Sequence, residues 1–260
     1  MKLSMVLSLQ DTSFGAVFKA ELDPLLKELR ELGFDGVELA LADPLEVDQR
    51  EVFRIVSEHG LEVPAVGTGQ AYLRDGLSLL SSDEGVRKKA VERIKNHVDF
   101  AQLFGAQVII GLIRGGKSVG KEFIDSMREC ADHALKKGII LTIEPINRYE
   151  VDFINNVEEA IDFIRSLGAK NVHLLLDTFH MNIEEPSIEK SIERSKPYLS
   201  HVHLADSNRE APGYGHLDFG SIIKTLKKIG YRRYLSAEIL PIPDQHKAAQ
   251  QTINLLRSLM

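Results

Sequence analysis

Residues 172–206 read "VHLLLDTFHMNIEEPSIEKSIERSKPYLSHVHLAD" and contain one full repeat of the pattern that decides the fold. Two short apolar runs, at 172–177 and 200–205, have the length and composition of buried strands. The residues at 186–195 between them have the apolar spacing of an amphipathic helix. A strand, a helix and a second strand in this order form a βαβ unit, whose two strands lie parallel in one sheet.

The same alternation extends over the whole chain in both directions. We expect strands near 2–8, 35–41, 62–67, 107–112, 139–144, 172–177, 200–205 and 234–239. We expect helices near 21–32, 46–59, 84–104, 119–137, 156–167, 186–195, 218–229 and 244–258. Glycines that can adopt a left-handed cap follow six of the helix patterns, at Gly33, Gly60, Gly105, Gly138, Gly168 and Gly230.

Eight strand and helix pairs in about 250 residues are the usual content of a (β/α)8 TIM barrel. We therefore predict an α/β protein with one barrel domain over residues 1–260, since no linker-like segment divides the chain. The alternative is an open doubly wound sheet, in which a glycine-rich phosphate-binding turn would follow an early strand. The loop "GTGQAYLRDG" at 67–76 does not have the spacing of that turn, which favours the barrel.

Composition narrows the classes of partner and compartment. The net charge of -6 weighs against nucleic acid as a partner, because phosphate binding needs a basic face. The single cysteine, Cys130, allows no intramolecular disulfide and indicates a reducing compartment. The N-terminal "MKLSMVLSLQDTSFG" lacks the features of a signal peptide, and no run of about 18 apolar residues exists to span a membrane. We therefore expect a cytoplasmic protein with no membrane partner.

Polar residues stand at the ends of four consecutive predicted strands, which is where TIM barrels place their active sites. They are Glu144, Asp177, His203 and Glu238. In each strand the period-two alternation puts this residue on the face opposite to the apolar side chains that pack under the helices. We therefore expect the four side chains to converge in the barrel mouth.

Three carboxylates in one place would repel one another and raise one another's pKa values unless a cation lies between them. Oxygen ligands with one imidazole suit Mn2+, Mg2+ or Co2+ better than a structural zinc ion. Taken singly, each residue has an ordinary alternative role as a helix cap, a surface ion pair or a buried structural histidine. Together at one barrel end, the four favour a single divalent metal ion.

More polar residues follow in the loops after these strands, where substrate contacts are usually placed. The candidates that we favour for substrate binding are Glu150, His180 and Arg209. Residues that could equally serve to make turns are Asn147, Arg148, Asp206 and Asn208. We expect Asp218 to cap the helix that follows it.

The segments "IEPINRYE", "LLLDTFHMNIEE", "HVHLADSNR", "GHLDFGSIIKTLKKIGY" and "SAEI" carry a family resemblance. Together they resemble the xylose-isomerase-like barrels, and most closely the ketose 3-epimerases related to D-tagatose 3-epimerase. The resemblance implies one divalent ion, Mn2+ before Mg2+ or Co2+, held by the four strand-end residues. It also implies that the three favoured loop residues hold the O1/O2 end of a sugar, and that the enzyme is a homo-oligomer, a dimer or a tetramer. The N-terminal half, which includes Glu38, matches less distinctively.

The chemistry of these residues agrees with the implied reaction, epimerisation at C3 of a ketose or a keto-sugar acid. A carboxylate removes a proton beside a ketone only if the developing enediolate is stabilised, which a chelated metal ion does as a Lewis acid. Glu144 and Glu238 lie on strands three steps apart around the ring and can flank a substrate. We expect one to remove the C3 proton, giving a cis-enediolate, and the other to protonate the opposite face.

Several alternatives would use the same site. An aldose-ketose isomerase or a hydroxypyruvate-type isomerase would move the proton between C1 and C2, and an inosose dehydratase is a further alternative. For a keto-sugar acid, the candidate partners of its carboxylate are Arg114, Arg148 and Arg209. An abasic-site endonuclease built on such a barrel would need more histidine ligands and a basic face.

Overall fold

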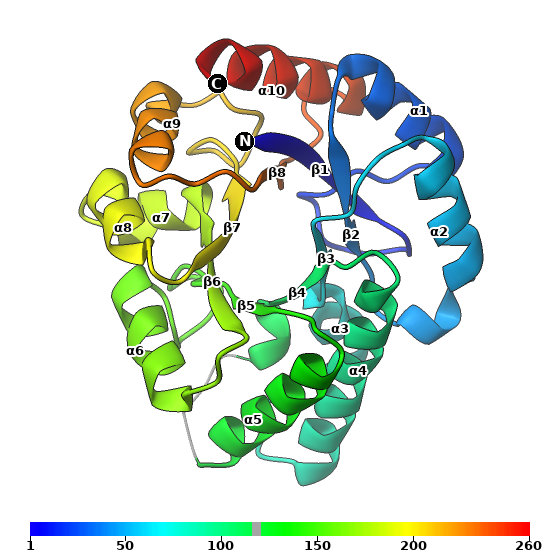
Figure 1. Cartoon of the computed structure of the whole chain (residues 1–260), viewed down its shortest axis with the longest axis vertical. Helices are drawn as coiled ribbons and strands as arrows, with labels where there is room; N and C mark the ends of the chain where they lie inside the picture. Colours follow the sequence, from blue (N-terminus) through cyan, green and yellow to red (C-terminus); the bar gives the residue numbers. More distant parts are fainter. Residues whose placement is uncertain (116–120) are drawn as a thin grey trace.

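Eight parallel strands form a closed barrel in the computed structural model, which describes residues 1–115 and 121–260. The strands follow one another around the barrel in sequence order, and the last pairs with the first. Helices surround the strands on the outside (Figure 1). The fold is therefore the (β/α)8 TIM barrel that the alternation of apolar patterns predicts.

All eight predicted strands are present, although most are shorter than predicted. They are β1 (Lys2–Ser8), β2 (Gly36–Ala40), β3 (Ala65–Gly67), β4 (Gln107–Ile110), β5 (Leu141–Ile143), β6 (Val172–Asp177), β7 (Leu199–Leu204) and β8 (Tyr234–Ala237). The predicted helices correspond to α1 (Leu22–Leu32), α2 (Gln49–Glu58), α4 (Glu84–Gln102), α5 (Lys121–Lys136), α6 (Val157–Leu167), α8 (Ile188–Ser195), α9 (Phe219–Lys228) and α10 (Gln245–Leu259). The start of the predicted helix 119–137 lies outside the described residues.

Four short elements were not predicted and lie in the loops after strands. They are η1 (Pro44–Glu46), α3 (Gly69–Asp75), η2 (Leu112–Arg114) and α7 (Thr178–Glu184). They are too short to show a helical period, which needs a window of about 11 residues or more. Three of them, α3, η2 and α7, contribute residues to the wall of the pocket described below.

The predicted helix ends are confirmed by the backbone. The six glycines expected after helices all have a positive φ, between 62° and 98°, which glycine adopts without steric cost. Asp218 caps α9 as predicted, because its carboxylate accepts a hydrogen bond from the amide of Ser221 at 3.0 Å. These local signals set where each helix ends and the chain turns back toward the barrel.

Apolar side chains form an outer core between the barrel and its helices, and separate small clusters inside the barrel. One inner cluster consists of Val6, Val17 and Ala40. The other consists of Ala65, Ile109 and Leu175. The outer core carries most of the buried apolar area, which is the main source of stability. The inner clusters are small because polar residues occupy much of the barrel interior.

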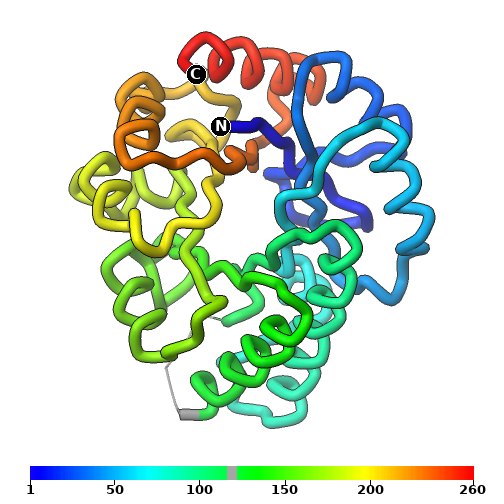
Figure 2. The backbone as a smooth tube through the Cα atoms, in the orientation of Figure 1, coloured from blue at the N-terminus to red at the C-terminus, as the bar shows by residue number. Residues whose placement is uncertain are grey.

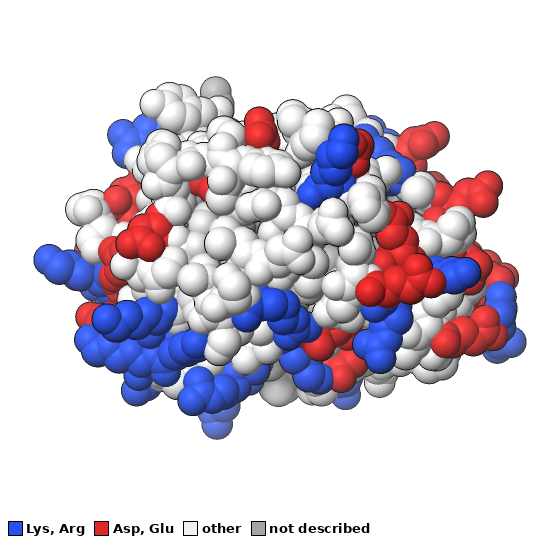
Figure 3. Space-filling view, turned by 90° about the horizontal axis from the view of Figure 1, so that it is seen from above, with Lys and Arg blue, Asp and Glu red and all other residues white. Residues whose placement is uncertain are grey.

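The two ends of the chain lie close together where the barrel closes, as the tube view shows (Figure 2). Lysines and arginines share the face seen in Figure 3 with aspartates and glutamates, and an uncharged area lies between them. This mixture of signs agrees with the overall charge of -6. Within the described part of the chain, no helix has the length and apolar content needed to cross a bilayer.

Candidate metal centre and active site

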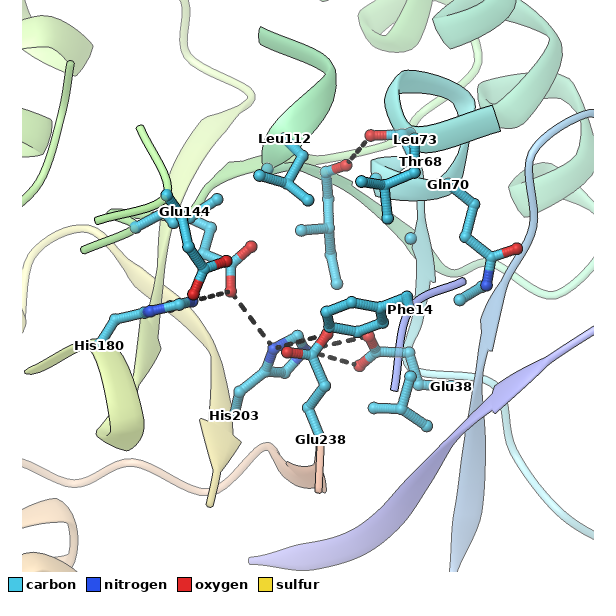
Figure 4. A pocket seen from close by; sticks show the side chains of 18 of the residues that line it. Phe14, Glu38, Thr68, Gln70, Leu73, Leu112, Glu144, His180, His203 and Glu238 are labelled. Atoms are coloured by element: carbon cyan, nitrogen blue, oxygen red, sulfur yellow. Dashed lines mark hydrogen bonds and ion pairs between the residues drawn. The ribbon is translucent and has the colours of Figure 1, made fainter. Parts of the chain in front are cut away.

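Four side chains from the C-terminal ends of β5 to β8 meet in the barrel mouth. Asp177 is the last residue of β6 and His203 lies near the end of β7, while Glu144 and Glu238 directly follow β5 and β8. Each residue contributes one ligand-type atom, and these atoms all lie within 4.8 Å of one another. The strand-end residues thus converge as the period-two alternation predicts. Figure 4 shows His203 next to the carboxylates of Glu144 and Glu238.

The imidazole of His203 is at the centre of this group. Its Nδ1 atom lies 3.6 Å from Glu144 Oε1, 3.9 Å from Asp177 Oδ2 and 3.9 Å from Glu238 Oε1. Both His203 Nδ1 and Asp177 Oδ2 are fully buried and have no hydrogen-bond partner among the described residues. Buried polar atoms without a partner are costly and rare in native proteins. Here they point toward a shared centre.

The environment drives the pKa values of the two glutamates apart. Burial raises the pKa of Glu238 to about 8, and the carboxylates of Glu144 and Asp177 add to this rise. Burial would also raise the pKa of Glu144, but the nearby His203 imidazole, with smaller contributions from His180 and Arg114, outweighs it and lowers that pKa. Two nearby carboxyl groups with different proton affinities are the usual arrangement of an acid and base pair.

The donor set fits a divalent cation. Three carboxylates and one imidazole form a hard, oxygen-rich set, which suits Mn2+, Mg2+ or Co2+. A cation at the shared centre would partner both His203 Nδ1 and Asp177 Oδ2. The second oxygen of Asp177 is already used, since Oδ1 caps α7 through the amide of Phe179 at 2.7 Å. This cap fixes the direction in which Oδ2 points.

Three of the four residues, Glu144, His203 and Glu238, line one side of a pocket at the barrel mouth, and Asp177 is not among its lining residues. The opposite side is formed by the segments after β1, β3 and β4, from which Phe14, Gln70, Leu73 and Leu112 contribute side chains (Figure 4). Gly111 also lines the pocket, and a Cβ atom there would lie 2.6 Å from Glu144 Oε2. The absence of a side chain at this position therefore makes room for the Glu144 carboxylate.

The three residues favoured for substrate binding all line this pocket. Arg209 donates hydrogen bonds to Glu150 Oε1 and Glu238 Oε2, both at 3.1 Å. His180 Nδ1 accepts a hydrogen bond from the Asn147 amide at 2.8 Å, so its Nε2 carries the proton and faces Glu144 and Asp177 at 4.0 Å. The structure thus brings these candidates into one hydrogen-bonded group beside the four strand-end residues.

The loop after β7 holds Arg209 in an unusual backbone conformation. Its φ is 63°, a region that residues other than glycine rarely adopt. The buried Asp206 carboxylate organises this loop by accepting hydrogen bonds from the amides of Ser207, Gly213 and Leu217. The guanidinium of Arg209 lies 5.0 Å from the ring centre of Phe14 and 4.8 Å from that of Phe179. Arg209 is therefore held by charge, by loop geometry and by two aromatic rings.

Two of the three arginines proposed as partners of a substrate carboxylate do not serve that role. Arg114 is fully buried, and its guanidinium donates to four backbone carbonyls, those of Gly111, Glu144, Phe153 and Ile154. Arg148 forms an ion pair with Glu184 at 2.7 Å and does not line the pocket. The prediction for these two arginines was wrong, because a sequence does not show which cations are already paired. Arg209 does line the pocket.

Of the residues that could equally make turns, Asn208 and Asn147 have different roles. Asn208 makes a turn, since its side chain bonds the backbone of Glu210 and Tyr214. Asn147 instead connects two pocket residues, because its amide donates to Glu150 Oε1 at 2.9 Å and to His180. Asn147 therefore orients a proposed substrate contact from behind.

We did not select Glu38 or His201 as functional residues from the sequence. Glu38 lines the pocket, and His201 is buried inside the barrel. Glu38 lies in β2 and accepts hydrogen bonds from His201 Nε2 at 2.8 Å and from His203 Nε2 at 3.0 Å. Burial would raise the pKa of Glu38, but the two histidines lower it far below its usual range. The signal that could have identified Glu38 is an acidic residue in the middle of an apolar strand, "GVELA".

The fold and the site define a (β/α)8 barrel with a candidate divalent-metal centre at its C-terminal mouth. A family model described as the xylose isomerase-like TIM barrel matches residues 26–259, and the chain belongs to this family. Its curated relatives include sugar epimerases, which are isomerases that act on carbohydrates.

Individual relatives agree with this assignment. The chain is 31% identical to an L-ribulose 3-epimerase of Mesorhizobium japonicum over 85% of this chain and 76% of the relative. It is 32% identical to a D-psicose 3-epimerase of Agrobacterium fabrum, over 82% and 78% of the two chains. A 3-dehydro-D-guloside 4-epimerase of Escherichia coli is 28% identical, over 87% and 90%. Among solved structures, a D-allulose 3-epimerase of Methylomonas sp. matches with a TM-score of 0.84 and 26% identity, covering 100% of this chain and 98% of that chain.

Proposed function

We propose that the protein is a metal-dependent epimerase that inverts the carbon next to the ketone of a ketose or keto-sugar acid, in the first instance C3. The observation that carries the proposal is the convergence of Glu144, Asp177, His203 and Glu238 within 4.8 Å, with buried and unpartnered atoms directed at their centre. We propose these four as the ligands of one divalent ion, with Mn2+ preferred over Mg2+ and Co2+. When bound, such an ion supplies Lewis-acid stabilisation of negative charge on the substrate oxygens.

Glu144 and Glu238 are the proposed acid and base pair. Both direct one oxygen toward His203 Nδ1 and keep a second oxygen, which in Glu238 is bonded to Arg209. Their carboxylates approach the pocket from different strands, which suits removal of a proton from one face of the substrate and its return to the other. Burial raises the pKa of Glu238 to about 8 and the pKa of Glu144 is lowered, so the two carboxyl groups differ in proton affinity when no ion is bound. The intermediate between the two transfers is a cis-enediolate.

Glu150, His180 and Arg209 are the proposed contacts of the sugar oxygens beside the reacting carbon. His180 presents an N–H donor, and Arg209 presents a cation held between aromatic rings. Preorganised donors of this kind stabilise negative charge on an enediolate without having to reorganise during the reaction. Arg209 is also the proposed partner of a substrate carboxylate, now that Arg114 and Arg148 are engaged elsewhere.

The names of the relatives indicate what the substrates have in common. In a ketose 3-epimerase the ketone is at C2 and the inverted carbon is C3. In a 3-dehydro-sugar 4-epimerase the ketone is at C3 and the inverted carbon is C4. In both cases the inverted carbon carries a proton next to a ketone. The proposed substrate therefore contains a ketone adjacent to a hydroxyl-bearing carbon.

The test is isotope exchange in deuterated water with the Mn2+-loaded enzyme and a panel of ketoses and keto-sugar acids. Epimerisation predicts deuterium at the carbon next to the ketone and formation of the epimer. We expect Glu144→Gln and Glu238→Gln each to reduce exchange by about 10²-fold or more, since a catalytic acid or base contributes about that much. Exchange at C1 alone would replace the proposal with an aldose-ketose isomerase, and cleavage of abasic DNA alone would replace it with a nuclease.

The proposal also includes the compartment and the oligomeric state of the enzyme. We propose a single-domain cytoplasmic enzyme that forms a dimer or a tetramer, supported by its resemblance to the ketose 3-epimerases and by its single buried cysteine. Light scattering of the purified protein measures the mass of the assembly, and a monomer at all concentrations would contradict this part.

A further inference from the structure

Glu38 contacts His203 Nε2, whereas the three carboxylate ligands face Nδ1, and Figure 4 shows Glu38 and Glu144 on opposite sides of the ring. Glu38 is 1% exposed and comes from β2, across the barrel from β7. Its carboxylate accepts hydrogen bonds from two histidine rings, His203 Nε2 at 3.0 Å and His201 Nε2 at 2.8 Å. A buried carboxylate that receives two N–H groups is held in a fixed position.

The hydrogen bond from His203 determines which ring nitrogen is free. A carboxylate only accepts hydrogen bonds, so the His203 nitrogen that faces Glu38 must carry a proton. That nitrogen is Nε2, and in the neutral imidazole that a metal ion requires it is the only N–H. Nδ1 then has a lone pair, and it faces Glu144, Asp177 and Glu238 at 3.6 to 3.9 Å.

We infer that Glu38 is a positioning residue of the metal centre, which fixes the tautomer and the ring orientation of His203 and so presents Nδ1 to the ion. This inference rests on the proposed function only through the identity of the metal ligands. Glu38 would act through His203 and not by contact with the ion. Carboxylates that orient a metal-bound histidine in this way typically change metal affinity by about 10- to 100-fold.

Glu38, His201 and His203 could in principle form a second metal site, since they are three buried ligand-type residues close together. The distances from the two histidine Nε2 atoms to the Glu38 carboxylate indicate hydrogen bonds. The N···O separations of 2.8 and 3.0 Å are those of direct N–H···O bonds, and an ion between the same atoms would take the place of both protons. The cluster is therefore better described as the support of the first site.

Two serines lie beside this group, on the strands between β7 and β2. Ser236 Oγ lies 3.0 Å from His201 Nε2, and Ser4 Oγ lies 2.6 Å from Ser236 Oγ. All three residues are fully buried. His201 holds one Glu38 oxygen while His203 holds the other, so the carboxylate cannot rotate without losing a charged hydrogen bond. Ser4 touches neither histidine, which makes it a suitable control.

The test compares Mn2+ binding to the wild-type protein, Glu38→Gln and Ser4→Ala, measured from the free-ion EPR signal. Glutamine has the size of glutamate but offers one acceptor and one donor where two N–H groups arrive. We expect Glu38→Gln to bind Mn2+ about 10- to 100-fold more weakly and Ser4→Ala to bind like the wild type. If Glu38→Gln does not fold, Glu38→Asp serves instead. Its carboxylate is one methylene shorter, and its affinity should also fall.

A second measurement does not depend on affinity. In the Mg2+-saturated protein, the N–H protons of His201 and His203 that bond to Glu38 should give downfield proton NMR signals that exchange slowly with water. Glu38→Gln should shift or remove both signals, whereas Ser4→Ala should retain the signal of His203. A purely structural role for Glu38 would lower stability without changing the His203 signal in the folded variant.

The outcomes separate this inference from the proposed function. Wild-type Mn2+ affinity in Glu38→Gln, or in Glu38→Asp if that variant is needed, would overturn the positioning role even if the wild type epimerises a ketose. Weakened binding in a protein that shows no exchange beside any ketone would keep the positioning role and overturn the proposed function. A wild type that binds no divalent ion would overturn both.

Discussion

Replacing Gly111 by alanine is the sharpest test of how the backbone positions the catalytic glutamate. Gly111 follows β4 and lies beside the carboxylate of Glu144. A Cβ atom on residue 111 would lie 2.6 Å from Glu144 Oε2, well under the 3.0 Å that real Cβ contacts respect. The next neighbour, Ile146 Cδ1, is at 3.6 Å and would not be disturbed. The strain therefore falls on the proposed ligand and base.

The size of the effect follows from this distance. To restore an ordinary contact of 3.4 Å, the Glu144 oxygen has to move by roughly 0.8 Å, which exceeds the tolerance of about 0.5 Å of a functional constellation. A misplacement of about 1 Å can cost about 10²-fold in rate, so we expect kcat/KM to fall by about 10- to 100-fold. This corresponds to about 1.4–2.7 kcal/mol of lost transition-state stabilisation. The affinity for Mn2+ should fall as well, because the same carboxylate is a proposed ligand.

The assay is Mn2+ binding and the rate of ketose epimerisation for Gly111→Ala, with Gly67→Ala as the control for Mn2+ binding. Gly67 lines the same pocket, but a Cβ there would meet Ala40 Cβ at 3.6 Å, an ordinary van der Waals distance. We expect the control to bind Mn2+ with the affinity of the wild type. Equal Mn2+ affinity and equal kcat/KM in Gly111→Ala and the wild type would refute the placement of Glu144 in the site.

Three further predictions concern protonation and stability. Burial raises the pKa of Glu238 to about 8, so this carboxyl group is largely protonated at pH 7. It must lose its proton to bind a cation, and the affinity for Mn2+ should therefore rise between pH 6 and 8. Calorimetry in buffers of different ionisation enthalpy should detect release of at least one proton per ion, and a pH-independent affinity would contradict this. Arg114→Lys should lower the free energy of unfolding in urea by about 2–3 kcal/mol, because lysine cannot satisfy the carbonyls that the guanidinium bonds; an unchanged midpoint would count against it. Gly36→Ala should lower the free energy of unfolding by about 1–3 kcal/mol, because the new Cβ would clash with the backbone oxygen of Glu62. Thermal unfolding measures this loss of stability.

The barrel could be predicted because its signals are local and repeated. Each strand is a short apolar run, each helix has its own period, and the glycines at 33, 60, 105, 138, 168 and 230 have the positive φ that a left-handed cap requires. The short α7 was missed because it begins directly after β6, with no turn residue between them. Asp177 both ends the strand and caps the helix, so one residue marks two boundaries.

The convergence of the four strand-end residues could also be predicted, since a period of two fixes the side to which each side chain points. Which side chains pair with one another could not be predicted from the sequence. Glu38 and His201 are 163 positions apart, and only barrel closure brings β2 within reach of β7. Arg114 has the same formal charge as Arg209, but its surroundings are four backbone carbonyls and not a ligand cavity. Side-chain pairing across the barrel depends on tertiary distances, which a single sequence does not contain.

The interior of the barrel contains a polar group and small apolar clusters, and their placement bears on how the site is stabilised. The polar group spans four adjacent strands, β7, β8, β1 and β2, and contains His201, Ser236, Ser4 and Glu38. One apolar cluster, on β3, β4 and β6, contains Ala65, Ile109 and Leu175. A hydrogen-bonded chain across adjacent strands can orient His203 from behind, because each member is held by its neighbours. The apolar side cannot orient a ligand, but its low polarity strengthens the interactions of the carboxylates above it. Replacing Glu38 or His201 by an apolar residue should therefore weaken the metal site before it weakens the barrel.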